Sequence, residues 1–167
     1  MKNKLSFFLL ALLLCLSSST RAFALDPGNT APDFDLPGTQ GNVKLSNIAG
    51  SVVYLDFWAS WCGPCKQSFP WLNSIHDKFR AQGLKVIGVN LDAKNEDALK
   101  FLSQLPAKFP VAFDSKGMTP RSYGVKGMPT SFLIGRDGKI IFQHQGFKES
   151  DRTGLEKQIQ TALETKR

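Results

Sequence analysis

The stretch Val52-Val53-Tyr54-Leu55-Asp56-Phe57-Trp58-Ala59-Ser60-Trp61-Cys62-Gly63-Pro64-Cys65-Lys66 joins a nearly continuous apolar run to two cysteines three residues apart. The apolar run is typical of a buried strand, and the residues after the first cysteine predict a helix. Two thiols at this spacing at the start of a helix lie on one face, where their sulfurs can close or release a disulfide with little backbone movement. The segment therefore predicts a strand–loop–helix unit with redox chemistry.

Zinc binding and a purely structural disulfide are the two other uses of cysteines at this spacing. A structural zinc site needs four ligands, but the only other cysteine is Cys15, and His76 and His144 are far apart in sequence. A purely structural disulfide would close a loop too short to constrain the unfolded chain much. We therefore expect no metal, and no cofactor other than a redox-active disulfide between Cys62 and Cys65.

The first 24 residues have the form of a secretory signal peptide. Lys2 and Lys4 precede an apolar run from Leu5 to Leu16, and Ala22-Phe23-Ala24 fits the small-x-small pattern that signal peptidases cleave. The apolar run of 12 residues is shorter than the roughly 20 residues that cross a bilayer as a helix.

An uncleaved anchor and a lipid on Cys15 are the alternatives to a cleaved signal, although the bulky Leu14 disfavours lipidation. We expect cleavage after Ala24, a periplasmic location, and one domain over residues 25–167. The chain carries a formal net charge of +7, and no block of Lys and Arg with interleaved aromatic residues is present, so nucleic acid is not an expected partner.

Helices and strands alternate after the cysteine pair. The pattern predicts a helix from Pro64 to about Ala81, a buried strand over Leu84–Leu91, a helix over Asn95–Leu105 and a short strand around Val111–Phe113. This β-α-β-α-β order indicates an α/β fold with parallel strands.

The ends of the domain carry weaker signals. Thr130–Ile134 and Lys139–His144 flank turn residues and predict an antiparallel hairpin, after which Ser150 or Asp151 can cap a last helix. Phe34–Leu36 and Val43–Leu45 could pair as edge strands near the N-terminus. The expected fold is therefore a central mixed β-sheet flanked by helices.

The residues from Asp56 to Lys66 closely resemble the active-site segment of thioredoxins, including the Cys-Gly-Pro-Cys motif. Pro70 falls where thioredoxins have a proline in their active-site helix, and Gly127-Met128-Pro129-Thr130 is similar to their cis-proline loop. Gly146 sits where they carry a glycine after the last strand. The resemblance implies a thioredoxin-like fold.

Two further segments resemble exported thiol-disulfide oxidoreductases of the TlpA/ResA kind. They are Ala31-Pro32-Asp33-Phe34 near the expected mature start and the helix–strand segment between Asp92 and Asp114. The chain is thus identified as a member of a TlpA/ResA-like family, with an N-terminal strand addition and an inserted helix–strand segment.

Roles for the catalytic residues follow from this chemistry and resemblance. Cys62 at a helix N-terminus is the expected nucleophile, because unpaired amides and the helix dipole favour its thiolate. Cys65 is the expected resolving cysteine, and the resemblance implies Asp56 as its proton acceptor. The partner lysine of thioredoxins is replaced by Gly88, so burial without a nearby cation should raise the pKa of Asp56.

Substrate contacts are expected from residues around the two thiols: Trp61, Gly63, Pro64, Met128 and Pro129. The resemblance implies a cis Met128–Pro129 bond and an extended substrate strand beside Met128. The resemblance to TlpA/ResA-like proteins also implies a further acid in the inserted segment; Asp92 and Glu96 are the candidates, and the sequence does not choose between them.

The expected function is dithiol–disulfide exchange that reduces protein disulfides outside the cytoplasm, with electrons from a membrane donor. Gly63 and Pro64 between the cysteines resemble reducing thioredoxins, whereas oxidising relatives usually carry a polar residue there. A disulfide oxidase or isomerase is the alternative, followed by a thiol peroxidase. Apocytochrome c and copper-site proteins are among the possible substrates.

Overall fold

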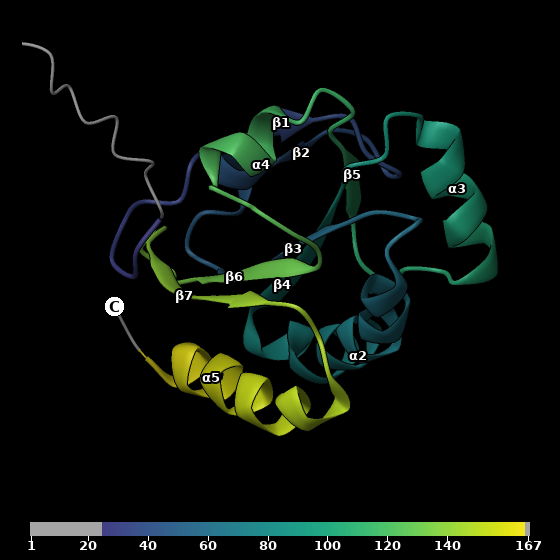
Figure 1. The fold of residues 1–167 in the computed structure, drawn as a ribbon. Helices are drawn as coiled ribbons and strands as arrows, with labels where there is room; N and C mark the ends of the chain where they lie inside the picture. Colours follow the sequence, from purple (N-terminus) through teal and green to yellow (C-terminus); the bar gives the residue numbers. More distant parts are fainter. Residues whose placement is uncertain (1–24, 166–167) are drawn as a thin grey trace, which may run out of the picture.

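The computed structural model describes residues 25–165, so the expected signal peptide over residues 1–24 lies outside the described residues. A mixed five-stranded sheet forms the centre, in the order β5-β4-β3-β6-β7 (Figure 1). The strands are β3 (Val52–Trp58), β4 (Leu84–Asn90), β5 (Val111–Phe113), β6 (Thr130–Ile134) and β7 (Ile140–Gln145). β3 runs parallel to β4 and antiparallel to β6, which places it at the middle of the sheet.

The apolar run before the cysteines forms β3 because helices and loops cover both of its faces. All seven residues of β3 are buried, as expected for a central strand with no face toward water. Its side chains divide between two cores: Tyr54 and Trp58 belong to one, and Leu55 and Phe57 to the other.

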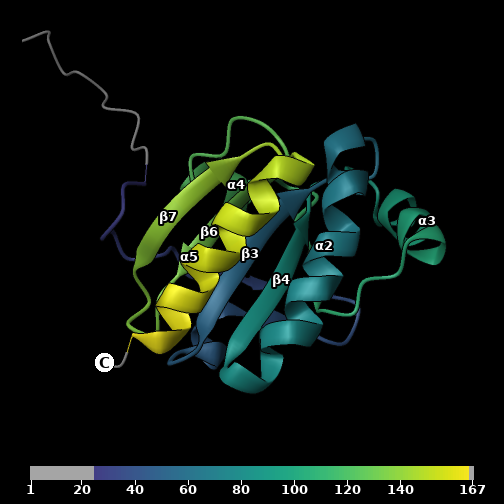
Figure 2. The ribbon, with the colours of Figure 1, turned by 90° about the horizontal axis from the view of Figure 1, so that it is seen from below.

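Within the described residues, four α-helices surround the sheet: α2 (Gly63–Phe79), α3 (Asn95–Gln104), α4 (Met118–Ser122) and α5 (Arg152–Glu164). α2 and α5 pack side by side on one face (Figure 2). On the other face, Tyr123 after α4 donates a 2.8 Å hydrogen bond to the carbonyl of Pro32. This bond holds the N-terminal segment against the chain that follows α4.

The fold confirms the predicted thioredoxin-like architecture, with differences at its margins. The N-terminal strands β1 (Asp35–Leu36) and β2 (Val43–Lys44) pair only with each other, as a separate two-stranded sheet. Short 3-10 helices occupy Leu45–Ile48, Arg80–Gln82 and Glu149–Asp151. The helix α4 was not predicted, because a five-residue helix that contains Pro120 has almost no periodicity to detect.

The predicted side-chain cap of the last helix, by Ser150 or Asp151, is not formed. Asp151 precedes α5, but its carboxylate accepts a hydrogen bond from the backbone N–H of Lys148 at 2.8 Å. Its side chain makes no capping bond to α5 itself. The carboxylate therefore closes the 3-10 turn that leads into α5.

Candidate functional site

The two cysteines sit where β3 ends and α2 begins. Cys62 is the N-cap residue of α2, and its Sγ accepts a hydrogen bond from the backbone N–H of Cys65 at 3.2 Å. Pro64 lies in the first turn, where its missing N–H leaves no hydrogen bond unmade. The sequence thus starts the helix at the motif and directs the backbone N–H of Cys65 at the Cys62 sulfur.

A disulfide joins Cys62 to Cys65. Cys65 is fully buried, while Trp61 just before the pair is 71% exposed. Cys62 is itself only 5% exposed, but it borders the groove described below, whereas Cys65 is 0% exposed and does not. This asymmetry suits an attacking and a resolving thiol.

A groove of about 610 Å³ opens beside the disulfide. We call it the active-site groove. The start of α2 forms one wall, and Leu91 and the segment from Gly117 to Met128 form the other. Its lining residues are Trp61, Cys62, Gly63, Pro64, Leu91, Gly117, Pro120, Arg121, Val125, Lys126, Gly127 and Met128. Four of the five residues expected to contact substrate, all but Pro129, are therefore among its lining residues.

The loop before β6 forms one side of this groove. The Met128–Pro129 peptide bond is cis. The loop is fixed on both sides of Met128, because the Thr130 hydroxyl donates to the Gly127 carbonyl at 2.7 Å and the Gly146 N–H donates to the Pro129 carbonyl at 2.8 Å. Within the described residues, the backbone N–H and C=O of Met128 have no hydrogen-bond partner.

Asp56 lies inside the fold on the face of β3 that α2 covers. Its neighbours on that face, Tyr54 and Trp58, belong to the same core as Cys65. The Asp56 carboxylate is 1% exposed and accepts a 2.6 Å hydrogen bond from the Ser131 hydroxyl at Oδ1, whereas Oδ2 has no partner within the described residues. Burial raises the pKa of Asp56 to about 7, although the Ser131 hydrogen bond acts in the opposite direction.

Gly88 is the direct partner of Asp56 in the register of β3 and β4. A Cβ at this position would lie 3.0 Å from the Trp58 indole nitrogen and 3.1 Å from a ring carbon of Phe109. Two buried aromatic rings thus occupy the space beside Asp56 that a larger side chain would need. The absence of a cation next to Asp56 follows from this packing.

The comparisons with known proteins agree with this geometry. The redoxin family model matches residues 26–159. The chain is 33% identical to the thiol-disulfide oxidoreductase ResA of Bacillus thuringiensis subsp. konkukian, over 87% of this chain and 90% of that protein. The chain belongs to the redoxin family, as a ResA-like thiol-disulfide oxidoreductase.

Solved structures lead to the same family. A crystal structure described as a thiol:disulfide interchange protein DsbE, from Chlorobium tepidum, is 65% identical to this redoxin with a TM-score of 0.82, covering 83% of this chain and 99% of that one. A solution structure described as a protein disulfide isomerase, from Bacteroides thetaiotaomicron, is 30% identical with a TM-score of 0.78, covering 86% and 94%. The predicted resemblance to thioredoxin-like oxidoreductases is therefore confirmed.

The two candidate acids of this redoxin occupy different places. Asp92 is buried and accepts hydrogen bonds from the backbone N–H and hydroxyl of Ser60, at 3.1 Å each, and from the Asn90 amide at 2.8 Å. Glu96 is exposed in the first turn of α3. Only Asp92 is therefore tied to the loop that carries Trp61 and Cys62.

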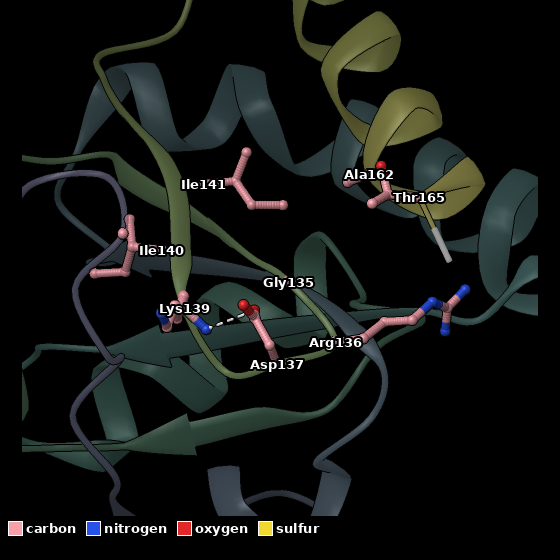
Figure 3. Close-up of a pocket in the computed structure, with 9 residues that line it drawn as sticks. Gly135, Arg136, Asp137, Lys139, Ile140, Ile141, Ala162 and Thr165 are labelled. Carbon is pink, nitrogen blue, oxygen red and sulfur yellow. Dashed lines mark hydrogen bonds between the residues drawn. The ribbon is translucent and has the colours of Figure 1, made fainter. Parts of the chain in front are cut away.

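A second hollow, of about 350 Å³, lies at the other end of the sheet (Figure 3). The β6–β7 turn and the end of α5 enclose it, and Arg136 reaches toward α5, donating hydrogen bonds to the carbonyls of Leu163 and Gly50. No cysteine of the described part of the chain lines this hollow. Across residues 25–165 there is also no cluster of three His, Cys, Asp or Glu side chains that could hold a metal ion.

Several residues of this site were not predicted from the sequence, among them Ser131, Arg121 and Lys126. Ser131 bonds Asp56 from a strand 75 positions away in sequence, and a serine in a buried strand gave no signal of this contact. Arg121 and Lys126 line the groove because α4 and the following loop fold back toward Cys62. Nothing in the sequence around Arg121 and Lys126 distinguished them from the other Lys and Arg residues.

Proposed function

We propose that this protein reduces disulfides of other proteins by dithiol–disulfide exchange. The observation that carries the proposal is the placement of Cys62 at the start of α2, on the wall of an open groove, with Cys65 buried behind it. A buried, proton-accepting carboxyl on the adjacent strand adds the group that the resolving step needs.

In the first step, the Cys62 thiolate attacks one sulfur of the substrate disulfide. The other substrate sulfur leaves as a thiolate and takes up a proton, which leaves a mixed disulfide with Cys62. Cys65 then loses its proton to Asp56 and attacks the Cys62 sulfur, so that the second substrate thiol is released. Two electrons pass to the substrate, and the chain finishes with the Cys62–Cys65 disulfide.

Substrate binding follows from the groove. The unpaired backbone N–H and C=O of Met128 are free to pair with an extended segment of the substrate. Trp61 offers an exposed apolar ring next to Cys62, and Gly63 and Pro64 line the groove beside it without a polar side chain. Pro129 has no N–H, so it cannot compete with substrate for the sulfur.

The reducing direction is favoured by the two residues between the cysteines. Neither Gly63 nor Pro64 has a side chain that could stabilise a Cys62 thiolate, and strongly oxidising pairs depend on such stabilisation. Oxidation or isomerisation of disulfides is the second candidate, favoured by the likeness to a structure described as a disulfide isomerase.

Residues 1–24 are proposed to export the chain to the periplasm, where residues 25–167 act as one domain. No helix of residues 25–165 has the length and apolarity needed to cross a membrane. Re-reduction would then require an electron donor in the membrane, and the substrates would be exported proteins such as apocytochrome c or copper-site proteins.

The test is reduction of a peptide disulfide by the pre-reduced protein, with Cys62→Ser and Cys65→Ser as variants. The original protein should reduce the peptide once per dithiol, Cys62→Ser should not react, and Cys65→Ser should accumulate a mixed disulfide that mass spectrometry detects. Reduction that survives Cys62→Ser would overturn the assignment of the nucleophile. Consumption of peroxide but not of the peptide disulfide would indicate a peroxidase instead.

A further inference from the structure

The walls of the active-site groove carry charge of one sign. Arg121 on α4 and Lys126 in the loop after it line the groove, and no aspartate or glutamate among residues 25–165 lines it. Neither cation forms an ion pair with a carboxylate within residues 25–165. The Arg121 guanidinium has the sulfur of Met118 as its neighbour, at 3.4 Å. Both charges are therefore available to an occupant of the groove.

The nearest acids in sequence do not reach the groove surface. Asp92 follows the lining residue Leu91, but it is 2% exposed and its carboxylate faces Ser60 and Asn90. Asp114 is 4% exposed, and its carboxylate accepts the backbone N–H of Thr119 at 2.7 Å. Each carboxylate is thus engaged in holding a loop or helix end.

The rest of the lining is mainly apolar or backbone. Trp61, Pro64, Pro120, Val125 and Met128 supply surface for aliphatic or aromatic side chains. Charges at the rim of such a groove change the rate of encounter and the choice of partner more than they change the affinity of the contact itself. A positive rim next to an apolar floor favours a segment with apolar and negatively charged side chains.

We propose that the active-site groove selects substrate segments in which acidic residues flank the reacting cysteine. This inference rests on the proposed function and specifies its substrate class. In an extended segment the rise is about 3.3 Å per residue, so side chains within a few positions of a cysteine held at Cys62 lie along the groove walls. Arg121 and Lys126 attract carboxylates at those positions and repel basic side chains.

The test uses short peptides closed by one disulfide, identical except that the residues flanking one cysteine are all Glu, all Gln or all Lys. The second-order rate constant of their reduction is measured by stopped flow, from the change in tryptophan fluorescence. At low salt we expect the order Glu, Gln, Lys, with roughly tenfold between the extremes. At about 1 M salt, where the Debye length falls to about 3 Å, the three rates should converge.

The variants Arg121→Gln and Lys126→Gln assign the effect to the groove. Each should reduce the preference for Glu peptides severalfold, and the double variant should abolish it. Lys157→Gln removes an exposed cation of α5 that does not line the groove and should leave the preference intact. Equal rates for the three peptides, or a preference that survives in the double variant, would overturn the proposal.

An uncharged disulfide, 2-hydroxyethyl disulfide, separates this inference from the proposed function. The unmodified protein and Lys157→Gln should reduce it at the same rate, because Lys157 does not line the groove and the reagent carries no charge to attract. If the unmodified protein fails to reduce this reagent and every peptide, the proposed function is wrong. If it reduces the peptides without regard to charge, the function stands and the selectivity does not.

Discussion

Ser131 on β6 donates a 2.6 Å hydrogen bond to Oδ1 of Asp56 on β3, and the two residues are direct partners in the antiparallel register of these strands. The hydroxyl is the only hydrogen-bond donor to this carboxyl within the described residues. With Gly88 on its other side, Asp56 has a neutral partner and no cation. Two opposing effects therefore set the pKa of Asp56: burial raises it, and the hydrogen bond from Ser131 lowers it.

Removing that hydrogen bond should raise the pKa of Asp56 further. The Ser131 hydroxyl stabilises the ionised carboxylate, so we expect the pKa in Ser131→Ala to lie above the value of about 7 in the original protein. Titration of the Asp56 carboxyl carbon by NMR measures this shift. Ser131→Thr keeps the hydroxyl and should stay close to the original value, and an unshifted pKa in Ser131→Ala would contradict the account.

The raised pKa of Asp56 also predicts how stability depends on pH. The folded carboxyl keeps its proton up to about pH 7, whereas the unfolded one loses it near pH 4. Folding therefore takes up a proton between these values, and stability falls as the pH rises through this window. Asp56→Asn has no carboxyl group at this position, so its stability should not show this fall with pH.

Urea unfolding of the oxidised protein tests this directly. Between pH 4 and pH 8, the free energy of unfolding of Asp56→Asn should increase relative to that of the unmodified protein by an amount on the order of 4 kcal/mol. Any constant effect of the new amide cancels, because only the change with pH is compared. Parallel pH profiles for the two proteins would show that the Asp56 pKa is not raised.

Gly88 should not tolerate a side chain. In Gly88→Ala the new methyl group would meet the rings of Trp58 and Phe109, which are fully buried and would have to shift to make room. We expect a loss of about 1–3 kcal/mol in the free energy of unfolding. Gly154→Ala is the matched control, since a Cβ there meets nothing within 4 Å and α5 should be unchanged or stabilised; equal stability of the two variants would refute the packing argument.

Asp92 is expected to position the loop before Cys62 and not to react. In Asp92→Asn, an amide group would face donors from Ser60 and Asn90 that now bond a carboxylate. Loss of these bonds should cost about 1–3 kcal/mol and change the rate at which Cys62 reacts with 2-hydroxyethyl disulfide. Glu96→Gln should alter neither quantity, and unchanged stability and rate in Asp92→Asn would remove its positioning role.

Much of this fold could be predicted from the sequence because its strongest signals are local. The apolar run of β3, the cysteine spacing and the periodicity of α2 each lie within a few turns of chain, and their boundaries agree with the structure to within a few residues. The contact between Asp56 and Ser131 depends on strand register instead. Register is set by the whole sheet, so no local pattern indicated it.

In the active-site groove, too, some residues have a local sequence signal and others are placed only by the fold. Trp61, Gly63 and Pro64 were predicted because they adjoin Cys62 in sequence. Arg121 and Lys126 come to the groove only through α4 and the loop after it, and a five-residue helix leaves no amphipathic pattern to detect. Substrate selectivity therefore could not be addressed before the fold was known.

The equilibrium reduction potential of the Cys62–Cys65 pair tests the central claim most directly. The pair is equilibrated with glutathione or dithiothreitol buffers and its thiols are trapped, with Cys62→Ser as the control that cannot form the disulfide. The account predicts a potential near the thioredoxin value of about −270 mV, as a reductase requires. A potential near about −120 mV would make the protein an oxidant and contradict the account.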